Sequence, residues 1–156
     1  MFILKAAFWT LALRLSLGWF MFFAGIEKVL DPSWTARGFL LSAKTFPEFY
    51  AWLASPANIW WIDPLNAWGI TLIGVALLLG VGVRAASWGG VAMMILYYFP
   101  HVAFPWVPHG FIVEEHIIYA AAFGLISVLP LANDFGLSHT LRQTFLGRVP
   151  LLRALI

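Results

Sequence analysis

Two adjacent residues near the start of the last long apolar stretch, Glu115 and His116, carry the side chains best suited to moving protons in this chain. Carboxyl and imidazole groups both exchange protons with a bound substrate, which is the basis of general acid and base catalysis. Lys28 and His101 lie at the ends of two other apolar stretches and supply hydrogen-bond donors. We therefore predict that Glu115 and His116 form a catalytic proton-carrying pair, with Lys28 and His101 binding ligand carbonyl oxygens.

Three further polar side chains within apolar stretches are candidates for the same ligand. Tyr119 shares a helical face with Glu115 and His116, and Tyr98 lies one turn before His101. We predict that both tyrosines contact a ligand ring. Arg14 lies deep in the first apolar stretch, where a charge costs about 2.5 to 3.5 kcal/mol, so it is also a candidate ligand-binding residue. Snorkelling of Arg14 to the inner headgroups is an equally weighted alternative.

A quinone suits such a site, because its two carbonyls need donors and its reduction consumes protons. Ordinary hydrogen bonding to lipid headgroups or between helices is weighed equally against it. A metal ion or haem is not expected. The candidate nitrogen and oxygen ligands have no HxxH or ExxH spacing, although together they could form a site: His101, His109, Glu115 and His116.

The composition excludes an ordinary water-soluble fold. Hydrophobic residues make up 62% of the 156 residues and charged residues 10%, against roughly half and a quarter in soluble domains. A membrane crossing needs about 20 apolar residues. Four windows qualify, at residues 6–26, 67–83, 85–104 and 111–132. We predict an all-α, multi-pass integral membrane protein, with residues 1–156 forming a single domain built as a four-transmembrane-helix bundle.

The connection over residues 32–63 mixes aromatic and charged residues, which predicts short amphipathic helices lying on the outer surface. Asp31-Pro32 and Asp63-Pro64 each resemble an N-cap followed by proline, so both pairs are expected to begin helices. Residues 133–156 form a basic C-terminal tail. Glu114 is expected to point away from the site and reach the headgroups.

The basic residues predict the orientation of the chain in the cell membrane. One side of the four-crossing topology holds Lys5, Arg84, Arg142, Arg148 and Arg153, and the other holds Lys28, Arg37 and Lys44. The excess on the first side predicts cytoplasmic N- and C-termini. The net charge is only +2, so no nucleic-acid partner is expected. Because the chain has no cysteine, it cannot use thiol exchange, and a redox role needs a bound carrier.

Several segments resemble the DoxX/DoxD family. The first is LRLSLGWFMFFAGIEKVL, with Arg14, Gly18, Gly25 and Lys28 at the family's characteristic positions. The second is LNAWGITLIGVALLLGVGVRAASWGGVAMM, which is similar to the family's second and third helices. Glu115 and the later NDFGLSHTL resemble the closing pattern, except that Ser138-His139 stands where the family often has Ser-Leu-Asp.

The resemblance implies a four-helix membrane protein similar to the small subunit of an archaeal thiosulfate:quinone oxidoreductase. By that likeness, Arg14, Lys28 and Glu115 become candidates for a quinone site or a structural polar site. We expect an oxidoreductase subunit that binds quinone near the outer leaflet, among membrane lipids and with protein partners or further copies of itself. The alternative is a non-catalytic structural or accessory subunit of a larger membrane complex.

Overall fold

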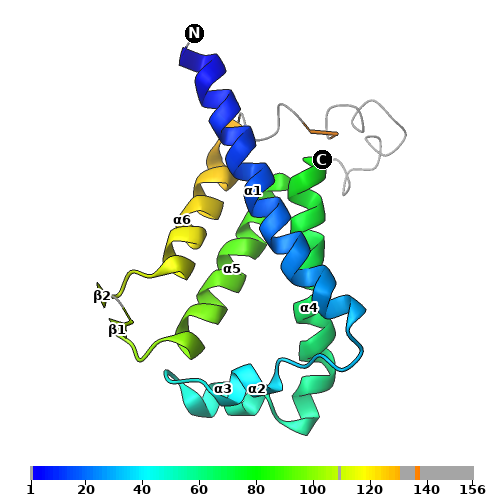
Figure 1. Ribbon diagram of the computed structural model, residues 1–156, viewed down its shortest axis with the longest axis vertical. Coiled ribbons are helices and arrows are strands. Elements are labelled where there is room, and N and C mark those ends of the chain that lie inside the picture. Colours follow the sequence, from blue (N-terminus) through cyan, green and yellow to red (C-terminus); the bar gives the residue numbers. More distant parts are fainter. Residues whose placement is uncertain (1, 109, 131–135, 138–156) are drawn as a thin grey trace.

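The computed structural model describes residues 2–108, 110–130 and 136–137, and this part of the chain is mainly helical (Figure 1). The predicted basic tail over residues 133–156 lies almost wholly outside the described residues. The elements in order are α1 (Phe2–Leu30), α2 (Arg37–Leu41), α3 (Pro47–Leu53), α4 (Pro56–Leu79), α5 (Val83–His101), β1 (Trp106–Val107), β2 (Gly110–Phe111) and α6 (Glu115–Val128). The all-α fold class is confirmed apart from the short β1–β2 hairpin.

Among the described residues, two helices are long and apolar enough to cross a membrane: Lys5–Leu30 within α1, and α4 over Pro56–Leu79. The helix α4 begins earlier than the predicted span 67–83 because Ser55 and Pro56 provide an extended N-cap and a proline in the first turn. The helix α6 has 14 residues, fewer than the predicted span 111–132, because β2 and the cap at Glu114 precede it.

The helices pack chiefly as two pairs, α1 with α4 and α5 with α6 (Figure 1). Glycines allow close contact in the first pair: a Cβ atom at Gly25 would meet Thr71, and one at Gly74 would meet the backbone of Phe22. Where the pairs meet, a buried apolar core joins all four helices. Its most enclosed members include Met21, Ile70, Leu77, Val83 and Phe123.

The short helices α2 and α3 lie across one end of the bundle, at the bottom of Figure 1. Pro100 explains one of their attachments to α5. Proline has no N–H, so it cannot donate to the carbonyl of Leu96 one turn earlier. Instead the Tyr50 hydroxyl of α3 donates to Leu96 O at 2.9 Å. Burial raises the pKa of Tyr50, which keeps its hydroxyl protonated as a donor.

Neither Asp-Pro pair begins a helix, so both of these predictions were wrong. Asp31 follows the end of α1 and accepts hydrogen bonds from the Ser33 N–H at 2.9 Å and the Ser33 hydroxyl at 2.6 Å. These bonds lower the pKa of Asp31. Asp63 and Pro64 lie inside α4. There Asp63 accepts a hydrogen bond from Ala36 N at 2.9 Å, so it fastens the start of α2 to α4 instead of capping its own helix.

Candidate functional site

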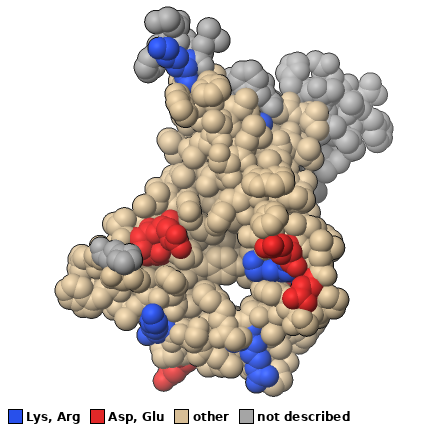
Figure 2. All heavy atoms as spheres, in the orientation of Figure 1, with Lys and Arg blue, Asp and Glu red and all other residues tan. Residues whose placement is uncertain are grey.

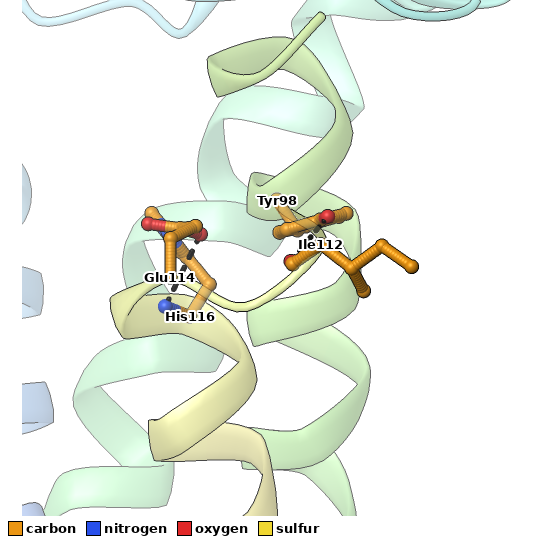
Figure 3. Close-up of polar contacts among 4 residues, drawn as sticks. All are labelled: Tyr98, Ile112, Glu114 and His116. Carbon is orange, nitrogen blue, oxygen red and sulfur yellow. Dashed lines mark hydrogen bonds and ion pairs between the residues drawn. The ribbon is translucent and has the colours of Figure 1, made fainter. Parts of the chain in front are cut away.

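The first turn of α6 carries a paired carboxylate and imidazole (Figure 3). Glu114 is the N-cap, with extended backbone, and its Oε1 accepts a hydrogen bond from His116 N at 3.2 Å. The same oxygen lies 2.6 Å from His116 Nδ1. A carboxylate accepts, so Nδ1 carries the proton in this pair and Nε2 is left to contact a ligand. Glu114 therefore orients His116. The prediction from the sequence was different, namely that Glu114 points away from the site and reaches the headgroups.

Aromatic rings from α5 surround the His116 ring. The centroid of His101 lies 5.7 Å away and that of Tyr97 lies 6.4 Å away. Tyr97 is held in place by its hydroxyl, which donates to Asn66 Oδ1 of α4 at 2.8 Å. This bond ties the two helix pairs together next to His116.

Two adjoining cavities meet at these residues, and four side chains form walls of both: Lys28, Tyr97, Glu115 and His116. The inner cavity, of about 140 Å³, lies among α1, α4, α5 and α6 and is otherwise lined by apolar and aromatic side chains. The outer cavity, of about 340 Å³, lies beneath α2, between it and the ends of the helices. In Figure 2, acidic and basic atoms gather around an opening in the same half of the molecule.

A third cavity, of about 360 Å³, lies on the hairpin side of α6. His101 and Glu115 line both this cavity and the outer cavity. Both side chains are exposed. They therefore present titratable groups to both cavities, which suits proton exchange between the two spaces.

Lys28 reaches the site from the last turn of α1. Its Nζ donates to Ala24 O at 2.6 Å and lies 5.6 Å from the centroid of the Trp34 ring. An ammonium group has three donors. One is used within α1, so the others can face the two cavities that Lys28 lines.

The structure brings together most of the predicted site residues: Lys28, His101, Glu115, His116 and Tyr119. Two others lie elsewhere. Tyr98 is buried, and its hydroxyl donates to Ile112 O at 2.6 Å, so it holds the segment before α6 and does not line these cavities. Arg14 is 1% exposed. A Cβ atom at Gly80 would lie 2.9 Å from its Nη1, which places Arg14 against the C-terminal end of α4.

Sequence reasoning missed Tyr97 and Asn66. Tyr97 precedes Tyr98, and only the packing of α5 decides which of the two neighbouring side chains faces α4 and α6. The sequence offered one signal for this contact, which was Asn66 itself. An amide in an apolar stretch needs a hydrogen-bond partner. The sequence did not indicate which residue would supply that partner.

Glu114, Glu115 and His116 could also hold a cation, since one ligand atom from each lies within 4.8 Å of the others. All three come from one turn of chain, and Glu114 Oε1 is already engaged with His116. The prediction that the protein binds no metal stays a prediction.

The fold and cavities define a helical protein with two described helices that are long and apolar enough to span a membrane, and with a polar site near one end of its bundle. The DoxX family model matches residues 9–103, and the chain belongs to this family of membrane proteins. The match runs from the second turn of α1 to just past the end of α5 and includes Lys28, Tyr97 and His101, whereas Glu115 and His116 lie beyond it. No curated protein matched the chain, and no solved structure did.

Proposed function

We propose that this DoxX-family protein is a membrane subunit of an oxidoreductase complex, in which it binds a quinone near the outer leaflet. The observation that carries the proposal is the shared wall of the two cavities. There Lys28 from α1, Tyr97 from α5, and Glu115 and His116 from α6 converge in otherwise mostly apolar, aromatic surroundings. Small-molecule sites are typically apolar concavities with a few polar groups that fix orientation. The outer cavity, at about 340 Å³, falls within the usual size range.

The proposed membrane arrangement has α1, α4, α5 and α6 as four crossings, with both termini in the cytoplasm. At about 1.5 Å per residue, α5 with 19 residues rises about 28 Å and α6 with 14 residues about 21 Å. The hydrocarbon core is about 30 Å thick, so α5 nearly spans it, whereas α6 falls about 9 Å short and needs flanking residues to complete its crossing. We place the first turn of α6 at the outer interface. The site is then close enough to the surface to exchange protons with water.

Each polar side chain has a role that follows from its position. Lys28 and His101 donate hydrogen bonds to the ring carbonyls, as does His116 through Nε2 when it is protonated. Tyr119 provides an aromatic wall, with its ring centroid 5.1 Å from that of Phe20. Glu115 and His116 carry protons, and His101 joins them because His101 and Glu115 both line the cavity on the water-facing side as well as the outer cavity.

A quinone, when bound, supplies the redox chemistry by accepting two electrons and two protons. The chain has no cysteine, so its own residues provide no thiol couple. The electrons come from an external reductant delivered by a partner subunit. The chain's own contribution is to bind and orient the ring and to conduct protons.

The test uses the complex in its native membranes, with Glu115→Gln as the variant and Glu48→Gln as the matched control. Glu48 is an exposed carboxylate in the first turn of α3 and lines none of the cavities described above. General acid and base groups contribute about 100-fold or more to rates. We expect Glu115→Gln to lower quinone reduction at least tenfold with unchanged protein levels, and Glu48→Gln to have no effect. Equal turnover in the two variants would remove the proton role.

Binding is tested separately by photolabelling with a short-chain azidoquinone, followed by peptide mapping. Saturable labelling near Lys28, Tyr97 and residues 115–119 is the expected result. Labelling confined to the opposite end, near Arg14, or no saturable labelling at all, contradicts a quinone site in these cavities.

A further inference from the structure

A fourth cavity, of about 80 Å³, lies between the α2–α3 segment and the facing sides of α4 and α5. Three of its wall residues, Phe39, Asn66 and Tyr97, also line the outer cavity of the candidate site. The two spaces therefore share a wall formed by these side chains. A molecule whose ring occupies the candidate site lies next to this fourth cavity.

The two hydroxyl groups in the walls of the fourth cavity are already engaged. The Tyr97 hydroxyl donates to Asn66, and the Tyr50 hydroxyl donates to the carbonyl of Leu96. The other wall residues are aliphatic, sulfur-containing or aromatic, such as Leu53 and Met93. A polar headgroup would lose its hydration there and gain few partners, whereas an apolar chain would lose nothing.

The outer mouth of this cavity opens on the lateral surface of the protein. Leu65 of α4 is 58% exposed and Leu96 of α5 is 45% exposed, and both line the cavity. On membrane-spanning helices, such exposed leucines face acyl chains. On the opposite side of the candidate site, between α1 and α6, the rings of Phe20 and Tyr119 are in contact, with centroids 5.1 Å apart and planes tilted by 38°, and they block that route.

We propose that this cavity takes the first isoprenoid units of the quinone tail and directs the tail between α4 and α5 into the lipid. The Tyr97–Asn66 pair then lies where the ring joins the tail and positions that junction. This inference rests on the proposed quinone function. If the tail binds in this way, the ligand is a long-chain quinone. The preference for such quinones then comes from apolar contacts with the first tail units.

The test compares quinones with zero to four isoprenoid units in nanodiscs, at equal concentrations in the lipid phase, by competition against the azidoquinone label. Binding should tighten over the first one or two units and then stay constant, because later units lie in lipid. Met93→Trp, which fills the cavity, should abolish this gain while tail-less quinone still binds. Leu72→Trp is the matched control, since Leu72 is an exposed α4 residue that does not line the cavity.

Leu65→Trp gives a second variant in case Met93→Trp fails to fold. The tryptophan narrows the opening of the fourth cavity at an exposed position. It should reduce the increase in affinity that the tail provides at least threefold. Saturable binding of tail-less quinone with no gain from a tail, or a gain that survives both Met93→Trp and Leu65→Trp, overturns the tail inference alone. Absence of saturable binding by any quinone overturns the proposed function itself.

Discussion

Replacement of Gly74 by alanine should loosen the crossing between α1 and α4. A Cβ atom at Gly74 would lie 2.5 Å from Phe22 Cα and 2.7 Å from Phe22 Cβ. Unstrained carbon contacts are about 3.5 to 4.0 Å. Because the obstacle includes the backbone of α1, no side-chain rotation can relieve it, and the two helices must separate by about 1 Å.

The change in the free energy of unfolding of Gly74→Ala follows from two opposing effects. Overpacking a close contact costs about 1 to 3 kcal/mol, and alanine regains up to about 1 kcal/mol of helix propensity over glycine. The net loss for Gly74→Ala should therefore be about 0 to 2 kcal/mol relative to the unsubstituted protein, and about 1 to 3 kcal/mol relative to a glycine-to-alanine change without a clash. A loss of about 2 kcal/mol corresponds to a roughly 30-fold fall in the ratio of folded to unfolded protein.

Gly124→Ala is the matched control, because Gly124 lies within α6 and a Cβ atom there meets nothing within 4 Å. This variant should be as stable as the unsubstituted protein, or more stable by up to about 1 kcal/mol. Stability is measured by titrating detergent-solubilised protein with sodium dodecyl sulfate and following helicity by circular dichroism. The comparison requires a single cooperative transition.

A Gly74→Ala variant as stable as Gly124→Ala would refute the close α1–α4 crossing. It would mean that the two helices are held apart by other side chains and that glycine is not needed between them. Greater stability of Gly74→Ala than of the unsubstituted protein would have the same meaning.

Three further predictions concern the segments that flank the bundle. Tyr50→Phe leaves the Leu96 carbonyl without its donor, so it should cost about 1 to 3 kcal/mol and speed amide hydrogen exchange in α2 and α3. Ser33→Ala should raise the pKa of Asp31 toward its ordinary value, as followed by carboxyl NMR. In the unsubstituted protein, the stability that these hydrogen bonds give to the turn is fully present above the ordinary pKa of Asp. It is lost as the pH falls through the lowered pKa of Asp31. Gly80→Ala forces a side chain into a backbone with φ of 67°, so it should lower stability by at least about 1 kcal/mol, measured by the same detergent titration.

The sequence was informative wherever a single physical requirement dominated. An apolar chain must satisfy its backbone hydrogen bonds internally in lipid, so composition and stretch length predicted long helices. The same reasoning singled out ionisable residues within those helices, because each is costly there. Lys28, Glu115 and His116 were found in this way, and they line the same cavities in the folded chain.

Local signals failed where tertiary contacts competed with them. Asp63-Pro64 has the pattern of a helix start, yet α4 runs through it because its earlier turns begin at Pro56 and Asp63 has a partner in Ala36. Arg14 and Lys28 share one helical face in the sequence. They serve opposite ends of the bundle, since 14 residues of helix separate them by about 21 Å.

The sequence by itself determined that the chain is helical, that it suits a membrane, and which residue types could carry chemistry, because these properties depend on composition and on spacing within one helix. Only the tertiary structure decided that Tyr97, and not Tyr98, faces the cavities. It also decided that Asn66 is the partner of Tyr97 and that Tyr50 satisfies the carbonyl freed by proline. Such choices depend on the rotation and depth of each helix relative to its neighbours, which are set by packing across the whole bundle.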